Sequence, residues 1–244
     1  MLSEFKEYVV TVDDIDIAVK VYGKEGGKPI VLLHGNGQRG ENLSNFIDLF
    51  DDDYHVLSID SRSHGDSEDT DKMSIKIMAT DVSEVLKFFN IKKAIILGYS
   101  DGGNIALRMA IDYPDMVSKM VVISANATPK GIVKQFRVGF SMMKDAMYFL
   151  SHKVKLISTT HYAKAKLLTD YPQIKKHELE TIDMPVLLVY AEFDLITKRH
   201  IKYIYRCLEN SRLLIILRTS HFSIVNRYAK YKDDVLDFIK HGIR

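Results

Sequence analysis

The run Gly98-Tyr99-Ser100-Asp101-Gly102 is the part of the sequence best suited to chemistry, because it presents a serine in the pattern G-x-S-x-G. Three fixed positions recur by chance, so the surroundings decide what the pattern means. The apolar run 94–97 precedes it and is expected to be a buried strand, and a helical pattern begins near Gly103-Asn104. A serine on so sharp a turn has strained backbone angles and needs glycine neighbours. The sequence therefore predicts that Ser100 is a nucleophile above the carboxyl edge of a sheet.

Such a serine needs a general base and an acid, because an unassisted hydroxyl is a poor nucleophile. The expected chain order is serine, acid, histidine. Asp194 follows the strand pattern of residues 185–190, and His221 follows that of residues 213–217, so both leave the edge that carries Ser100. We predict that His221 is the base and Asp194 the acid that orients it, with Glu192 as the rival acid. Other histidines sit within or beside other elements and suit a role such as solvated surface better: His55, His152, His161, His177, His200 and His241.

The loop His34-Gly35-Asn36-Gly37 is the predicted second half of the machinery. It follows the apolar run 30–33, and its glycines let the backbone approach a substrate closely. We predict an oxyanion hole made by the backbone N–H groups of Asn36 and Asp101. His34 is expected to hold the loop by hydrogen bonds and to take no part in the chemistry.

Strand and helix patterns alternate along most of the chain, which predicts the α/β class. Residues 7–11 and 15–22 are expected to form a hairpin, and unbroken Val/Ile/Leu runs predict strands buried on both faces of a parallel sheet. The remaining strands are expected at 30–33, 55–59, 94–97, 120–123, 185–190 and 213–217, and helices at 42–50, 75–89, 104–111, 201–208 and 228–239. The prediction is a mostly parallel central sheet of about eight strands with helices on both faces.

Residues 126–180 break this rhythm, because they show helical, Met- and aromatic-bearing sequence and no convincing strand. We interpret them as a helical cap inserted into a core made of residues 1–125 and 181–244. Within the cap, four apolar residues share one helical stripe and either attach the cap to the body or line an acyl pocket. The predicted pocket residues are Phe136, Phe140, Met143, Met147 and, outside the cap, Phe222.

Charge is unevenly spread, since residues 126–180 hold ten Lys and Arg against four Asp and Glu. Such a segment is either a solvated helix face or a surface that attracts an anionic substrate, an acidic carrier protein or a membrane surface. The whole chain carries a net charge of +2, which is too small to argue for binding to nucleic acid.

Length and composition fit a single globular domain of 244 residues, with 46% hydrophobic and 27% charged residues. No apolar run reaches the roughly 18 residues of a membrane span. The start of the chain, residues 1–7, lacks the pattern of a signal peptide, and the single Cys207 cannot form an internal disulfide. We therefore expect a cytoplasmic protein without metal or cofactor, and the oligomeric state stays open.

Taken together, these motifs resemble the α/β-hydrolase family over nearly the whole chain. Residues 60–67, Asp-Ser-Arg-Ser-His-Gly-Asp-Ser, are similar to the family loop D-x-R-x-x-G-x-S, which is usually structural near the pocket. The elbow is also similar to that of valacyclovir-hydrolase-like members, in which the carboxylate after the nucleophile is associated with amino-bearing substrates. Ala191 stands where the family usually has glycine. Members with an elbow aspartate, such as epoxide hydrolases and haloalkane dehalogenases, are excluded, whereas peroxidase-like members with the same triad stay open.

The resemblance and the residues together predict a carboxylic-ester hydrolase with a small-to-medium apolar acyl pocket and a small-molecule ester substrate. An amide, thioester or carbon–carbon bond hydrolase with the same triad is the alternative. A second alternative is a slow, receptor-like member of the fold that binds a ligand.

Overall fold

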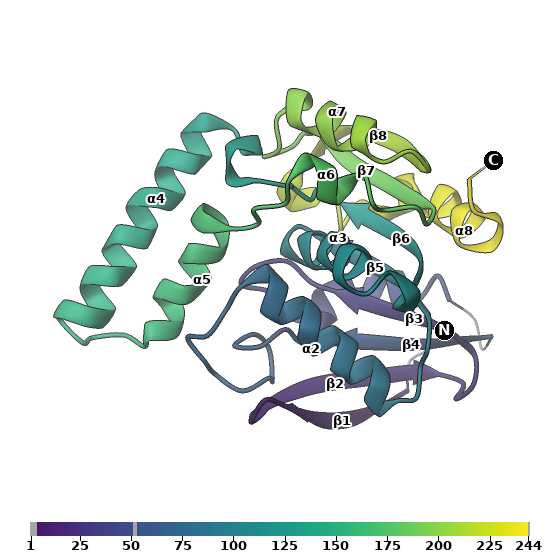
Figure 1. Cartoon of the computed structure of the whole chain (residues 1–244), viewed down its shortest axis with the longest axis horizontal. Coiled ribbons are helices and arrows are strands. Elements are labelled where there is room, and N and C mark those ends of the chain that lie inside the picture. The colour runs from purple at the N-terminus through teal and green to yellow at the C-terminus, as the bar shows by residue number, and fades with distance from the viewer. Residues whose placement is uncertain (1–3, 51–52, 244) are drawn as a thin grey trace.

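The apolar runs of the sequence form the centre of one mostly parallel sheet (Figure 1). The structure is a computed structural model that describes residues 4–50 and 53–243. The prediction that residues 1–7 are not a signal peptide therefore falls partly outside the described residues. Within them the eight strands are ordered β1-β2-β4-β3-β5-β6-β7-β8. Their bounds are β1 Phe5–Val12, β2 Ile15–Gly23, β3 Lys28–Leu33, β4 Tyr54–Ile59, β5 Ala94–Tyr99, β6 Val117–Ile123, β7 Val186–Phe193 and β8 Ser211–Ser220.

The strands of the sheet run parallel from β4 through β8, and only the pairs β1–β2 and β2–β4 are antiparallel. The predicted hairpin forms between β1 and β2, where Asp13 and Asp14 both have positive φ angles of 48° and 64°. Those angles suit the tight turns that join antiparallel strands. Every residue of β4 and β5 is buried, as in the centre of a parallel sheet, and β4 buries the polar residues His55 and Ser58 together with its apolar ones.

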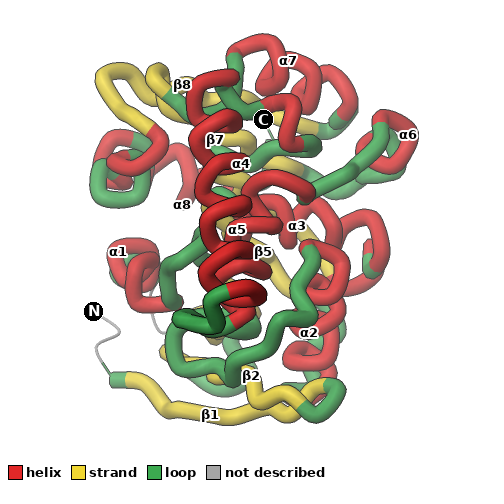
Figure 2. Tube along the Cα trace, turned by 90° about the vertical axis from the view of Figure 1, so that its left-hand side faces the viewer, coloured by secondary structure: helices red, strands yellow, loops and turns green. Residues whose placement is uncertain are grey.

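Helices cover both faces of the sheet (Figure 2). Side chains alternate along each strand, so Val31 and Leu33 pack in one apolar cluster with α2, α3 and α7, while Ile30 and Leu32 pack in the other with α1 and α8. The helices are α1 Ser44–Ile47, α2 Ile75–Phe88, α3 Asp101–Asp112, α4 Lys134–Tyr148, α5 Thr159–Asp170, α6 Lys176–Leu179, α7 Lys198–Cys207 and α8 Lys232–His241. The predicted class, a mostly parallel sheet with helices on both faces, is confirmed.

Four predicted helices differ in their bounds, and one of them, α7, begins at Lys198 rather than at residue 201. The helix after Ser100 begins at Asp101, directly behind the serine, and not near Gly103. The segment 42–50 forms only a 3-10 turn, Gly40–Leu43, followed by the short α1. The last helix is divided at Tyr231, whose φ of −142° is not helical, into a 3-10 turn at Tyr228–Lys230 and α8. Periodicity alone could not locate these breaks.

Between β6 and β7 the chain leaves the sheet and forms a helical hairpin that projects from the body (Figure 1). Helix α4 runs outward, a π-helical turn labelled η4 (Phe149–Lys153) follows, and α5 returns beside α4. None of the residues of α4 is buried. Helix α6 packs against α3 of the body and leads back to the sheet. No helix in the described parts of the chain is long and apolar enough to cross a bilayer.

Candidate active site

Ser100 stands on the sharp turn between β5 and α3. Its φ and ψ angles are 53° and −115°, a region that non-glycine residues rarely occupy. The backbone N–H of Ser100 donates to the carbonyl of Ile123 on the neighbouring strand at 2.8 Å and holds the turn in place. A side chain at Gly98 would collide with the backbone of Gly102, and one at Gly102 would collide with the carbonyl of Leu33. The two glycines of the motif therefore allow the elbow to pack against the sheet.

The three predicted catalytic side chains meet at the carboxyl edge of the sheet. Nε2 of His221 lies 3.2 Å from Oγ of Ser100, and Nδ1 of the same ring lies 2.7 Å from Oδ1 of Asp194. His221 follows β8 directly, and Asp194 follows β7. A ring with one nitrogen on a carboxylate and the other on a hydroxyl can accept the hydroxyl proton as the oxygen attacks an electrophile.

The carboxylate of Asp194 is buried but well supplied with donors. It accepts hydrogen bonds from His221, from the hydroxyl of Ser124 and from the backbone N–H groups of Ala191 and Ile196. Burial raises the pKa of Asp194, yet the hydrogen bond and charge of His221, with the other donors, outweigh it, so the pKa lies below its ordinary value. Asp194 is therefore ionised at neutral pH and can stabilise a positive imidazole.

Glu192, the rival acid, points elsewhere. Its carboxylate accepts from the backbone N–H of Arg218 at 2.8 Å. Ala191 occupies the position where the family resemblance implies glycine, and its N–H donates to Asp194 at 3.0 Å. The end of β7 therefore places Asp194 without a glycine at that position.

Tyr99 holds His221 from the other side, and sequence reasoning missed it. Its hydroxyl donates to the carbonyl of His221 at 2.8 Å, and the two rings lie 5.4 Å apart. A tyrosine directly before the nucleophile carries no recognisable signal of this role, because its partner is far away in the sequence.

The two predicted oxyanion donors flank Ser100. No acceptor within the described residues pairs with the backbone N–H of Asn36 or Asp101, so both remain available. Gly35 lies so close to the elbow that a Cβ there would meet Cβ of Ser100 at 3.2 Å. Such close approach of a loop backbone to the serine is what an oxyanion hole requires.

His34 holds this loop and is neutral. Its Nδ1 donates to the carbonyl of Gly35 at 2.8 Å, while Nε2 accepts from the backbone N–H of Ser61 at 3.0 Å, which fixes the tautomer. Burial lowers the pKa of His34 to about 4. The ring therefore connects the loop to the segment after β4, as the sequence led us to expect.

The side chain of Asp101 belongs to a buried network of amides that the sequence did not reveal. Its Oδ1 accepts from Nδ2 of Asn104, and its Oδ2 accepts from Nδ2 of Asn36, both at 3.0 Å. Nδ2 of Asn36 also donates to the carbonyl of Lys164 on α5 at 3.1 Å and so ties the loop to the helical hairpin. Burial outweighs the two amide hydrogen bonds and leaves the pKa of Asp101 above its ordinary value.

Asn126 ends this network with a free donor. The backbone N–H of Asn126 donates to Asn104 at 2.8 Å, so that atom of Asn104 must be its oxygen, and its Nδ2 then faces Oδ1 of Asn126 at 3.2 Å. Nδ2 of Asn126 is left buried beside the pocket, with no partner among the described residues. An unpaired buried donor costs free energy, which a ligand oxygen can recover.

A pocket of about 160 Å³ opens over Ser100 between the body and the hairpin. Its lining is mostly apolar apart from the catalytic candidates, Gln38 and the two asparagines Asn36 and Asn126. The apolar lining comes from the hairpin and from the loops after β6, β7 and β8: Ile132, Phe140, Leu167, Leu168, Tyr171, Leu195, Ile196 and Phe222. A larger hollow of about 690 Å³ lies at the opposite edge of the sheet, near β1 and the end of α2, and includes none of these residues.

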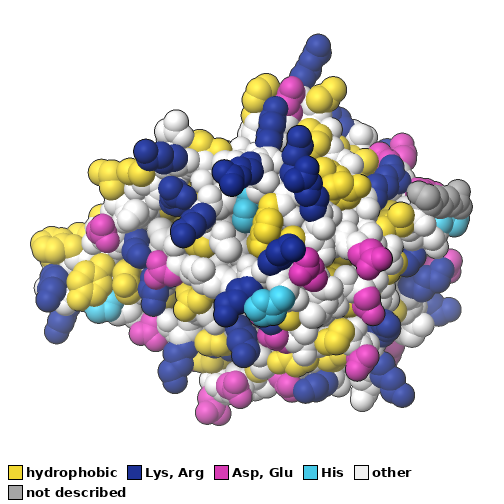
Figure 3. All heavy atoms as spheres, turned by 45° about the horizontal axis from the view of Figure 1, so that its top comes forward, with side chains coloured by type: hydrophobic (Ala, Val, Ile, Leu, Met, Phe, Trp, Pro, Cys, Tyr) yellow, Lys and Arg dark blue, Asp and Glu magenta, His cyan; other side chains and the backbone are white. Residues whose placement is uncertain are grey.

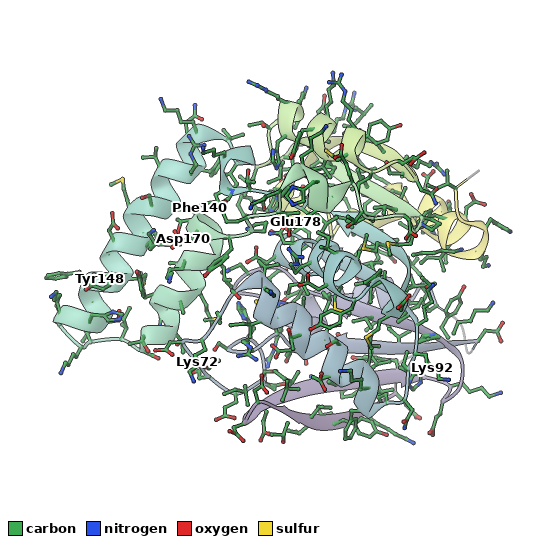
Figure 4. The ribbon with its side chains drawn as sticks, in the orientation of Figure 1. Lys72, Lys92, Phe140, Tyr148, Asp170 and Glu178 are labelled. Carbon is green, nitrogen blue, oxygen red and sulfur yellow. The ribbon has the colours of Figure 1, made fainter. Side chains whose placement is uncertain are left out.

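The predicted pocket stripe needs correction. Phe140 and Phe222 line the pocket, whereas Phe136, Met143 and Met147 do not. Figure 4 shows Phe140 on the part of α4 nearer the body. Helix α4 packs mainly on α5, so its apolar stripe mostly joins the two helices, and Phe136 is 43% exposed. Residues of α5 that sequence periodicity did not single out, Leu167 and Leu168, line the pocket in their place.

Comparisons with known proteins agree with this fold. Residues 28–140 match the family described as alpha/beta hydrolase fold. The crystal structure of MGS-M2, an alpha/beta hydrolase enzyme from a Medee basin deep-sea metagenome library, has a TM-score of 0.82 at 20% identity and covers 97% of this chain and 98% of its own. This chain has the α/β-hydrolase fold.

Two curated relatives of this α/β hydrolase carry names of ester-cleaving enzymes. A putative esterase/lipase of Haemophilus influenzae is 34% identical over 41% of this chain, a match that spans only 35% of that protein. A pimeloyl-[acyl-carrier protein] methyl ester esterase of Neisseria meningitidis is 24% identical over 89% of this chain and 95% of its own length.

The loop that resembles D-x-R-x-x-G-x-S supports the oxyanion loop of this α/β hydrolase. The carboxylate of Asp60 accepts from the backbone N–H groups of Gly40 at 2.6 Å and Asp66 at 2.8 Å. Arg62 and Asp81 form a buried ion pair through Nε and Oδ2 at 2.7 Å. These contacts are structural, as the resemblance implied.

The predicted surface role is wrong for two of the histidines. His55 is buried against Phe89. Nε2 of His200 accepts from the backbone N–H of Ala127 at 3.0 Å, and burial lowers the pKa of His200 to about 4. No cluster of three or more metal-binding side chains occurs within residues 4–50 and 53–243.

Proposed function

We propose that this α/β hydrolase is a serine hydrolase that cleaves carboxylic esters through an acyl-enzyme on Ser100. The single observation that carries the proposal is the continuous chain of contacts from Asp194 through His221 to Ser100, at 2.7 and 3.2 Å. Two free backbone donors beside the serine add what a tetrahedral intermediate needs.

The proposed cycle follows from these positions. His221 takes the proton of Ser100 as Oγ attacks the carbonyl carbon, and the N–H groups of Asn36 and Asp101 donate to the resulting oxyanion. His221 then gives that proton to the leaving alkoxide oxygen, and the ester C–O bond breaks. Water loses a proton to the same ring, attacks the acyl-enzyme and releases the acid, while the serine recovers its proton.

The proposed substrate has a small-to-medium acyl group. A volume of about 160 Å³ is below the roughly 300–1,000 Å³ common for ligand pockets, and the apolar lining favours a hydrocarbon chain. The relatives named as an esterase/lipase and a methyl ester esterase support an ester bond as the one that is cleaved. A cytoplasmic location stays a prediction.

A neutral substrate fits better than a cationic one. Both oxygens of the Asp101 carboxylate already accept from asparagine amides, and the side chain is buried, so it is poorly placed to bind an amino group. The free Nδ2 of Asn126 instead favours an acyl or alcohol group with an oxygen acceptor.

The test is a panel of p-nitrophenyl esters from acetyl to decanoyl, with a matched amide, thioester and vinylogous diketone. We expect kcat/KM to peak at short or medium chains and esters to exceed the other classes. Faster turnover of the diketone or the thioester would replace the ester assignment while keeping the same serine. Loss of all turnover in Ser100→Ala separates the enzyme from background hydrolysis.

A further inference from the structure

The turn that joins α4 to α5 exposes an unusual amount of apolar surface. This turn, residues 148–156, is called the cap tip below. Phe149 is 57% exposed, Val154 50% and Leu156 71%, and Tyr148 at the end of α4 is 41% exposed. In Figure 4 Tyr148 lies at the outer end of the hairpin, far from the sheet. Large apolar side chains at a projecting turn are costly in water and indicate a contact surface.

The cap tip is held in a defined shape, so these side chains do not fold back onto the hairpin. The backbone N–H of Val154 donates to Phe149 at 3.0 Å, and that of Leu156 donates to Leu150 at 2.9 Å. The ring of Tyr148 stacks on His152 with centroids 4.6 Å apart. The apolar side chains are therefore presented outward by an ordered backbone.

Positive charge surrounds this apolar surface. Residues 146–169 contain four lysines and neither aspartate nor glutamate. Lys153 and Lys155 alternate with Val154 and Leu156, and all four are exposed. Figure 3 shows hydrophobic and basic side chains side by side at the left end of the molecule, which is the end of the hairpin.

We propose that the cap tip docks on an anionic lipid surface, with Phe149, Val154 and Leu156 entering the boundary between headgroups and acyl chains. Lys153 and Lys155 would then lie at the level of the lipid phosphates. Apolar and aromatic residues next to lysines are the composition of segments that lie in such interfaces. A convex tip whose positions are all exposed or half-exposed except the buried Ser151 inserts easily into lipid, whereas a specific protein interface needs about 800 Å² on each partner.

The helices of the hairpin also connect the cap tip with the pocket. The same helix that ends at Tyr148 carries Phe140 into the pocket lining, and α5, which begins just after the cap tip, contributes Leu167 and Leu168. The hairpin thus connects the proposed docking surface with the proposed acyl site. The docking itself does not depend on the proposed ester hydrolysis, because binding to lipid is measured without turnover.

The experiment is cosedimentation of the full chain with vesicles, either pure phosphatidylcholine or a two-to-one mixture with phosphatidylglycerol. We expect binding to the mixed vesicles that weakens as salt rises. Phe149→Ser and Leu156→Ser should each lower the partition coefficient about tenfold, since each removes a buried side chain. Lys153→Gln and Lys155→Gln should each lower it about fivefold on anionic vesicles.

Matched controls lie elsewhere on the surface. Phe88→Ser and Leu217→Ser change residues that are 53% and 65% exposed at other sites, and they should leave vesicle binding unchanged. Circular dichroism and hydrolysis of a soluble short-chain ester verify that each variant is folded. Equal binding by the cap-tip variants and these controls would overturn the proposal, as would no binding to anionic vesicles. Capture by an acidic carrier protein that depends on the lysines but not on Phe149 or Leu156 would also overturn it.

Discussion

The carboxyl edge of the sheet and the helical hairpin above it are built in opposite ways. At the sheet edge, Ser100, Asp194 and His221 are fixed by backbone contacts to buried strands, and Asp194 alone accepts four hydrogen bonds. In the hairpin, α4 has no buried residue, and its outer end exposes Phe149 and Leu156. The sheet edge is held in place by the core of the protein, whereas α4 packs chiefly against its neighbouring helix α5.

This difference suggests a division of tasks. A buried, donor-rich edge keeps reacting groups within hydrogen-bond distance, which catalysis requires. An exposed hairpin contributes one side of the pocket and contacts with the surroundings, where exact placement matters less. Substitutions at the edge should therefore remove activity or stability, whereas substitutions in the hairpin should change which substrates or surfaces are preferred.

The largest effect is expected at the edge itself. Ser100→Ala and His221→Ala should each lower kcat about 10⁵- to 10⁶-fold, by analogy with serine-triad knockouts, and leave the fold intact. The double variant should be little worse, because the two residues act as a unit. Steady-state kinetics with circular dichroism checks this, and near-additive losses in the double variant would contradict a shared role.

The second largest loss of activity is expected on substitution of the acid, Asp194. Asp194→Asn should lower kcat about 10⁴-fold, since the amide preserves the shape but removes the charge that favours a positive imidazole. Glu192→Gln is the matched control and should be near neutral, because Glu192 contacts Arg218 and not His221. Reversed results for the two variants would show that the acid is Glu192.

Substitution of one glycine in each region should change the stability of the protein in opposite directions. Gly102→Ala should lower the free energy of unfolding by about 3 kcal/mol, because a methyl group there collides with the carbonyl of Leu33. Gly139→Ala on α4 meets no atom within 4 Å and should raise it by about 0.5–1 kcal/mol through helix propensity. Urea unfolding of both variants measures this, and a tolerated Gly102→Ala would refute the crowded elbow.

Within the hairpin, substitutions at Phe140 and Phe136 distinguish a residue that lines the pocket from one at the surface. Phe140→Ala should lower kcat/KM for the preferred medium-chain ester about tenfold, since it removes part of the acyl lining. Phe136→Ala should stay within about twofold on the same substrate. Equal losses in both would mean that α4 acts on the pocket through its packing rather than through Phe140.

The smallest effect concerns substrate charge. Matched amino, neutral and carboxylate esters should differ in kcat/KM by no more than about threefold, because amide donors occupy both oxygens of Asp101 and most lysines of residues 126–180 are exposed to solvent. The comparison is made at two ionic strengths. A strong preference for the amino ester that Asp101→Asn abolishes would return Asp101 to the substrate site. A salt-sensitive preference for the carboxylate ester would assign recognition to the cap lysines.

The sequence predicted the parts of the molecule that local rules control. Short unbroken apolar runs located most of the strands, and the glycines around Ser100 marked the elbow, because each feature depends on a few adjacent residues. Chain order and strand ends were enough to select Asp194 and His221. The helix after Ser100 was predicted to begin three residues too late, because its first turn contains two glycines that hide a helical pattern.

Other parts depend on contacts that no local pattern encodes. The network of Asn36, Asp101, Asn104 and Asn126 joins segments far apart in the chain, and its amide orientations follow only from the full set of partners. Periodicity placed Phe136 and Phe140 on one stripe, but it could not say that only Phe140 reaches the pocket. The rotation of a helix relative to its neighbour is a tertiary property.

The most direct test of the central claim is labelling with a fluorophosphonate probe followed by peptide mass spectrometry. We predict one covalent adduct, on Ser100, that forms rapidly in the native protein, slows by orders of magnitude in His221→Ala and is absent in Ser100→Ala. Such a result requires an activated serine at the elbow. An unlabelled Ser100 in the folded protein, or a rate that does not change when His221 is removed, would contradict the account.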